Sequence, residues 1–179
     1  MHINDIVNCR TDLLTFSKTI FKSRKGIDWV ENWHHKVICE HLERVVIGDI
    51  KRLVINIPPR YSKTELAVIN FIAWCIGNYP DSEFIHASYS KRLATNNTWN
   101  VRAIVESEIY KEIFGEIELR NDSNAKDEWR TTAGGCVYAT GAEGTITGYG
   151  AGGMSKNFKG CISMDDIHKA GEANSTTMR

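Results

Sequence analysis

The pair Lys63-Thr64 is the strongest chemical signal in the sequence. It follows an apolar, β-branched run over residues 52–57, which predicts a buried strand, and it opens an apolar segment with helical character. Strand, short loop and helix in this order are typical of phosphate-binding loops, in which backbone N–H groups and a helix N-terminus face an anion. Lys63 would then reach the β- and γ-phosphates of a nucleotide, and the Thr64 hydroxyl would coordinate Mg²⁺.

The loop departs from the usual G-x-x-x-x-G-K-[ST] pattern at both glycines. Ile57 and Ser62 stand at those positions, where Gly is favoured because the backbone adopts conformations that are costly for other residues. This segment alone therefore leaves two interpretations open. It is a phosphate loop, or it is a strand followed by a Pro-Pro turn and an amphipathic helix.

A pair of carboxylates, Asp165-Asp166, ends a second short apolar segment at residues 160–164. Ligands of open parallel sheets bind at the carboxyl ends of the strands, so we expect Asp165 at the same edge as Lys63 and Thr64. There Asp165 would hold Mg²⁺, directly or through water, and Asp166 would polarise an attacking water. A lone Asp-Asp pair is more often a capped turn, but together with the loop it predicts a Mg-nucleotide site.

Hydrolysis requires further groups. P-loop ATPases of this kind mostly carry Asp-Glu, and the shorter side chain of Asp166 withdraws the carboxylate by one methylene. A basic group must also meet the charge that develops on the γ-phosphoryl oxygens. Arg60 is the candidate that the loop itself supplies; the alternative is an ordinary surface arginine after two prolines.

The elements that must position these residues alternate along the chain. Helices are predicted at 11–22, 31–47, 64–76 and 91–105 and up to about Phe114, strands at 52–57, 83–88 and 160–164, and a β-hairpin at 129–132 and 136–140. This order indicates an α/β domain with a mainly parallel sheet flanked by helices and a β-hairpin insertion.

A glycine-rich segment over 141–153 follows the predicted hairpin, with six glycines in thirteen residues. It is either a flexible linker or a loop packed over the nucleotide site. The sequence leaves these two interpretations equal.

Length and composition set the remaining limits. The chain of 179 residues suits one domain, and its 22 basic and 22 acidic residues give no overall signal for nucleic-acid binding. Five scattered cysteines predict buried apolar positions in a reducing compartment rather than disulfides or a zinc site. The polar N-terminus and a longest apolar run of 11 residues predict a soluble, intracellular protein.

With these residues in place, the chain resembles the ATPase domain of tailed-bacteriophage terminase large subunits, the motors that package genomic DNA. Pro58-Pro59-Arg60-Tyr61-Ser62-Lys63-Thr64 is similar to the phosphate loop of one terminase branch, Pro-Pro-Arg-x-[Gly/Ser]-Lys-[Ser/Thr]. The resemblance spans roughly residues 30–175. It also rests on Trp33-His34-His35, Leu42-Glu43, Arg52-Leu53, Ala87-Ser88-Tyr89-Ser90, Leu93-Ala94, Ile109-Tyr110, Phe114, Thr147-Gly148-Tyr149-Gly150 and Met164-Asp165-Asp166-Ile167-His168-Lys169.

The resemblance implies a P-loop NTPase fold with ATP and Mg²⁺ as cofactors. It implies an N-terminal helical segment at 1–30 and an ATPase domain at 31–179, truncated after the strand that carries Asp165, without the later coupling strand or the nuclease domain. Asp166 takes the place of the catalytic acid, Arg60 senses or stabilises the γ-phosphate, Asp165 supports the metal, and Trp33 and His34 lie where such motors contact adenine. The implied nucleotide-binding residues are Pro59, Arg60, Tyr61, Ser62, Lys63, Thr64 and Glu65, and the implied metal ligands are Thr64 and Asp165.

The implied function is ATP hydrolysis coupled to translocation of double-stranded DNA into a procapsid. The implied partners are DNA, the portal, the small terminase subunit and further copies of the chain in a ring, in the host cytoplasm and without a membrane. Two alternatives remain open. One is a truncated module that binds nucleotide, DNA or partner subunits without turnover, and the other is a different P-loop ATPase, such as a helicase-like protein.

Overall fold

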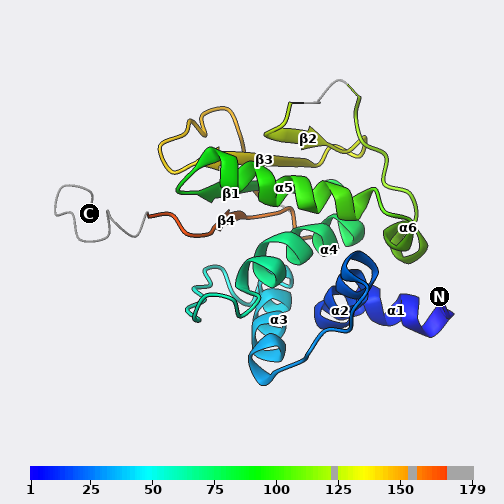
Figure 1. Cartoon of the computed structure of the whole chain (residues 1–179). Helices are drawn as coiled ribbons and strands as arrows, with labels where there is room; N and C mark the ends of the chain where they lie inside the picture. The colour runs from blue at the N-terminus through cyan, green and yellow to red at the C-terminus, as the bar shows by residue number, and fades with distance from the viewer. Residues whose placement is uncertain (122–124, 153–156, 169–179) are drawn as a thin grey trace.

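The protein has an α/β fold, seen in a computed structural model that describes residues 1–121, 125–152 and 157–168 (Figure 1). A four-stranded, mostly parallel sheet is flanked, in this part of the chain, by six α-helices and one π-helical segment. The helical elements are α1 (Ile3–Thr11), α2 (Leu13–Lys25), α3 (Trp33–Val46), η1 (Glu65–Asn70), α4 (Phe71–Asn78), α5 (Lys91–Val105) and α6 (Glu108–Phe114). The strands are β1 (Glu83–Ser88), β2 (Glu128–Arg130), β3 (Cys136–Gly141) and β4 (Ile162–Met164).

The sheet has the order β2-β3-β1-β4, with β1 parallel to both of its neighbours. The predicted hairpin is confirmed, since β2 pairs antiparallel with β3 through the turn at 131–135. It is no insertion, however. Because β3 also pairs along its full length with β1, the hairpin forms one side of the main sheet.

Helix α5 covers the centre of the sheet and has the predicted bounds. It starts at Ser90, whose hydroxyl accepts a hydrogen bond from the Leu93 N–H at 3.2 Å, as N-cap serines do. It packs on β1 and β3, and Figure 1 shows it lying over these strands. The chain therefore passes from the carboxyl end of β1 through a short turn into α5.

The N-terminal helices pack below the sheet in Figure 1. The predicted helix at 11–22 is α2, and α1 before it was not predicted. Asp12 separates the two: its backbone is extended, and its carboxylate accepts a hydrogen bond from the Thr15 N–H at 2.6 Å. Buried side chains of both helices, among them Cys9 and Phe16, belong to the same hydrophobic cluster as α3, α4 and α5.

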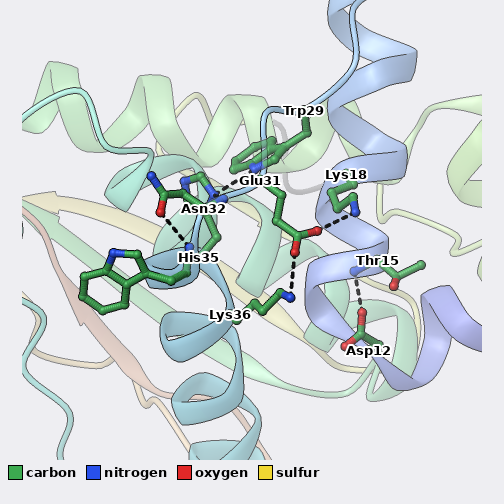
Figure 2. A network of polar contacts seen from close by, with 9 residues as sticks. Asp12, Thr15, Lys18, Trp29, Glu31, Asn32, His35 and Lys36 are labelled. Carbon is green, nitrogen blue, oxygen red and sulfur yellow. Dashed lines mark hydrogen bonds and ion pairs between the residues drawn. The ribbon is translucent and has the colours of Figure 1, made fainter.

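The start of α3 is fixed by His35 (Figure 2). Its Nδ1 accepts hydrogen bonds from the Trp29 indole and from the Asn32 backbone N–H, each at 3.1 Å. Glu31 pairs with both Lys18 and Lys36. The connector before α3 is thereby held between α2 and α3.

The helical segment after Lys63-Thr64 is buried on almost every face, as predicted. It begins as the π-helix η1 and continues as α4. Its apolar residues form the centre of the main hydrophobic cluster, and Tyr110 of α6 donates a hydrogen bond to the Ala73 carbonyl at 2.8 Å. The helix behind the loop is thus anchored on several sides.

The predicted strand at 52–57 is wrong. This segment forms no ladder with any described strand, and alternate side chains are half-buried and exposed, with Val54 81 % exposed. Leu53, Ile55 and Ile57 pack on the core from one side only. A continuous apolar run suggested burial on both sides, whereas only one side of the segment meets the core.

The glycine-rich segment packs on the sheet as far as the structure describes it; Gly153 lies outside the described residues. The Tyr149 ring stacks on Tyr138 of β3, with ring centroids 3.6 Å apart, and its hydroxyl donates to Glu128 at 2.6 Å. The Gly152 N–H donates to the Glu83 carbonyl of β1. These contacts place the segment against β1, β2 and β3.

Four of the five cysteines are buried, and Cys161 is partly exposed. The prediction that cysteines fill apolar positions is therefore confirmed for those four. Among the described residues, no helix combines the length and the apolar character needed to cross a bilayer.

Candidate functional site

The loop before η1 has an unusual backbone conformation at two residues. Arg60 and Ser62 have φ values of 69° and 63°, in the left-handed region. This region is costly for residues with a Cβ, which is why glycine is usual there. Pro59 and Arg60 form a turn shortly before the helix that starts at Lys63.

Lys63 joins the two halves of the site. Its ammonium lies 3.2 Å from Asp165 Oδ1 and 3.3 Å from Asp166 Oδ1. Burial alone would lower the pKa of Lys63, but the two carboxylates outweigh it and the pKa lies above its ordinary value. The lysine is therefore charged, and it points to the place where β4 ends.

Thr64 contacts the same carboxylate. Its hydroxyl donates to Asp165 Oδ2 at 2.5 Å, across 101 residues of sequence. Asp165 is only 6 % exposed, and each of its oxygens has one partner from the loop. The expectation that Asp165 lies beside Lys63 and Thr64 is confirmed, whereas the binding roles of these residues stay predictions.

Asp166 differs from Asp165 in exposure. Its side chain is 61 % exposed, and its φ is 47°. The Asp166 carbonyl accepts a hydrogen bond from the Tyr89 N–H at 2.9 Å. This bond ties the end of β4 to the turn between β1 and α5.

The other residues predicted to bind nucleotide lie in environments that differ from one another. The side chains of Pro59 and Arg60 are exposed. The Tyr61 ring contacts His34 of α3, with centroids 5.5 Å apart. Glu65 points away from Lys63, since its carboxylate pairs with Arg24 of α2 at 2.6 Å. The structure thus assembles Lys63, Thr64 and both aspartates but not Glu65.

Sequence reasoning missed a group of buried polar side chains behind Asp165. His86 and Ser88 of β1 are fully buried, and Asn97 of α5 is 4 % exposed. A histidine in the middle of an apolar strand was the one available signal. The pairing of Arg24 with Glu65 could not be predicted from the sequence pattern. Arg24 also donates a hydrogen bond to the Asn100 side chain of α5 at 3.2 Å.

The donor set at Asp165 suits Mg²⁺ together with phosphate oxygens. Among the described residues, no group of three or more His, Cys, Asp or Glu side chains could hold a metal ion by itself. Mg²⁺ is usually held by one or two carboxylates, with substrate phosphates and waters completing the shell. The Thr64 hydroxyl and the Asp165 carboxylate supply oxygen ligands of this kind beside the Lys63 ammonium.

Comparisons of the chain with models of protein families, with curated proteins and with solved structures found no match. The function is therefore inferred from the residues and geometry of the site.

Proposed function

We propose that this chain binds Mg-ATP and is the ATPase domain of a viral DNA-packaging motor of the terminase large-subunit type. The observation that carries the proposal is the meeting of Lys63-Thr64 with Asp165-Asp166 at the carboxyl end of the sheet. A lysine and a hydroxyl residue after a left-handed loop, facing an aspartate at a strand end, are the parts with which P-loop proteins hold a nucleotide.

Each residue then has a distinct task. Lys63, charged and now paired with the two aspartates, holds the β- and γ-phosphates. Thr64 and Asp165 hold Mg²⁺, which when bound neutralises charge on the phosphate oxygens. Asp166 orients the attacking water and accepts its proton, and Arg60 meets the charge that develops on the γ-phosphoryl group.

The aromatic residues at the start of α3 support a base site next to the phosphate loop. Trp33 is 73 % exposed and contacts His34, and the His34 ring in turn contacts Tyr61 of the loop. Flat rings with free faces stack on nucleobases. We therefore place adenine near Trp33 and His34, on the side of Tyr61.

The motor assignment rests on the terminase resemblance together with this site. In a motor of this kind, hydrolysis switches the loops at the nucleotide between two arrangements and so moves a DNA-gripping surface. The partners are double-stranded DNA, further copies of the chain in a ring, the portal and the small terminase subunit. The place of action is the host cytoplasm, with transient docking on the procapsid.

Nucleotide binding without turnover is the second candidate, and two observations favour it. Asp166 is exposed and paired with Lys63, so its carboxylate is not held over a water position. The segment 52–57 before the loop has no ladder partner among the described strands, which leaves the loop without the support of a sheet. In this case neighbouring subunits would have to complete the catalytic site.

Asp166→Asn separates the two candidates. We expect the variant to bind Mg-ATP with the affinity of the wild type, because Lys63, Thr64 and Asp165 remain. Its phosphate release should fall by about 10²-fold or more, as expected for the loss of a general base. Binding by calorimetry and phosphate release would be measured in the same samples.

The outcomes are distinct. Turnover by the wild type and none by Asp166→Asn supports the ATPase. Binding without turnover in both proteins selects the second candidate. Undiminished hydrolysis by the variant would show that the catalytic acid lies elsewhere.

A further inference from the structure

A layer of buried polar side chains lies between the sheet and α5, behind Asp165. Side chains alternate along a strand, so Phe84, His86 and Ser88 of β1 share one face. Phe84 belongs to the main hydrophobic cluster, and the amide nitrogen of Asn97 on α5 lies 3.1 Å from His86 Nε2. This face of β1 is therefore the one covered by α5.

The strand register places Asp165 on the same face. His86 pairs with Ser163, and Ala87 pairs with Met164. The Asp165 N–H donates to the Ala87 carbonyl at 3.0 Å, so the pairing continues beyond β4 and brings Asp165 beside Ser88. Cross-strand neighbours share a face, and His86 is then the diagonal neighbour of Asp165. The carboxylate has the loop on one side and this layer on the other.

The His86 ring presents a donor toward this region. Because Nε2 accepts from Asn97, the proton of the neutral ring is on Nδ1. The Ser163 carbonyl also lies near the ring.

Two buried donors in the layer lack a partner among the described residues: His86 Nδ1 and the Ser88 hydroxyl. Buried donors without acceptors are costly, and such groups in a folded protein call for an explanation. Asp165 is the anionic acceptor on the same face. In this structure its two oxygens are used by Thr64 and Lys63.

We propose that Asn97, His86 and Ser88 are positioning residues that hold the Asp165 carboxylate when Thr64 and Lys63 turn from it to metal and phosphate. The inference rests on the proposed Mg-nucleotide site. Asn97 fixes the His86 tautomer, and the Nδ1–H and the Ser88 hydroxyl replace the two donors that Asp165 loses. Hydrogen bonds to a charged acceptor are the stronger kind, so the exchange keeps Asp165 oriented. Because Asn97 belongs to α5, the exchange also links nucleotide binding to that helix.

The first test measures the Mg²⁺ dependence of nucleotide binding for Ser88→Ala and Asn97→Leu. Substitution of a residue that orients a metal ligand typically weakens metal binding by about 10–100-fold. We expect the half-saturating Mg²⁺ concentration to rise at least about fivefold, while ATP affinity without Mg²⁺ and the unfolding temperature change little. The matched control is Thr98→Val, since Thr98 is also buried on α5 but its hydroxyl donates to the Thr95 carbonyl of its own helix.

A general loss of stability would lower binding with and without Mg²⁺ alike, and that result would contradict the proposal. So would a Mg²⁺ dependence equal to that of Thr98→Val. A merely structural role for the layer thus gives a different pattern from a positioning role.

The second test needs no nucleotide. Nitrogen-15 spectra of the His86 ring are compared between the wild type and Thr64→Ala, which removes one donor from Asp165. We expect the Nδ1-protonated tautomer in both proteins, and a downfield shift of the Nδ1 proton in Thr64→Ala as His86 takes over the freed oxygen. Thr98→Val should leave this resonance unchanged.

Together, the two tests distinguish a failure of the proposed function from a failure of the positioning role. If the wild type fails to bind Mg-ATP but Thr64→Ala shifts the His86 proton, the proposed function is wrong and the positioning role stands. If Mg-ATP binds and neither the nucleotide nor Thr64→Ala alters the His86 resonance, the positioning role is wrong.

Discussion

At the scale of single residues, the loop carries backbone strain at Ser62, where phosphate loops usually carry glycine, and also at Arg60. Ser62 and Arg60 are in the left-handed region, and the next residues are Lys63 and Thr64, which contact Asp165. Strained backbone persists where the surrounding structure holds it, and such positions concentrate at functional sites. Here the contacts to Asp165 and the buried helix behind the loop supply that support.

Replacement of Ser62 by glycine tests this strain. We expect Ser62→Gly to raise the free energy of unfolding by about 0.5–1 kcal/mol, because glycine adopts φ near 63° without the Cβ penalty. Ser62→Ala is the control: it removes the same hydroxyl but keeps the strain, so it should not stabilise. Urea unfolding of the three proteins measures the difference. Equal effects of both substitutions would mean that the backbone at Ser62 is unstrained.

At the scale of elements, the start of α3 depends on a neutral histidine. His35 Nδ1 accepts two hydrogen bonds, and burial lowers its pKa below the ordinary value of 6.5. The folded state therefore binds this proton less readily than the unfolded state does. Stability from His35 is fully present above pH 6.5 and is lost as the pH falls below 6.5 through the lowered pKa.

The variant His35→Gln should weaken this pH dependence. Glutamine at this helix position can accept a hydrogen bond from the Asn32 N–H, as in a capping box. We therefore expect the variant to lose less stability than the wild type when the pH falls from 7.5 to 5.5. His86, whose pKa is also lowered, leaves a residual dependence of the same sign. Thermal unfolding at several pH values measures the change. His41→Gln, at a half-buried position of α3, is the control, and an effect as large as that of His35→Gln would contradict the assignment.

Local patterns predicted several elements well. Helix α5 has both a serine cap and helical periodicity, and β1 is a compact apolar run between polar residues, so both were found with their bounds. Helix α1 was missed because its apolar residues are sparse and mostly exposed. The segment 52–57 was assigned to a strand because an apolar run does not reveal whether a ladder partner exists.

The candidate site was predictable where one general rule applied. Carboxyl ends of parallel strands share an edge, and this rule predicted Asp165 beside Lys63 and Thr64. Of the two segments, only β4, which leads to Asp165, is a strand of the sheet, so the contact was predicted although the segment 52–57 before Lys63 is not a strand. The pairing of Glu65 with Arg24 depends on how α2 lies against η1. The layer of His86, Ser88 and Asn97 depends on strand register. Neither packing nor register can be obtained from residue spacing.

At the scale of the whole molecule, charge gives little attraction for nucleic acid. The chain has 22 basic and 22 acidic residues, and many of its surface lysines and arginines are paired with carboxylates. A motor subunit that binds the phosphate backbone of DNA needs only weak contacts, because neighbouring subunits in a ring bind the same DNA at the same time. If the proposed motor function holds, the isolated chain has no need of high affinity for DNA.

DNA binding by the isolated chain should accordingly be weak, independent of sequence and steeply dependent on salt. We expect dissociation constants of about 10⁻⁴–10⁻⁶ M at physiological salt, which weaken further as counterions are added. Fluorescence anisotropy with several labelled duplexes over a salt series measures both properties. A tight, salt-resistant complex with one sequence would contradict the motor assignment.

The central claim is that Lys63, Thr64 and Asp165 form a Mg-nucleotide site. Its most direct test is a calorimetric titration of Mg-ATP, and of a non-hydrolysable analogue, into the wild type, Lys63→Ala and Lys22→Ala. Lys22 is an exposed lysine with an ion pair to Asp28, so its loss controls for charge alone. We expect binding by the wild type and by Lys22→Ala, with none detectable for Lys63→Ala. Unchanged affinity in Lys63→Ala, or no binding by the wild type, would contradict it.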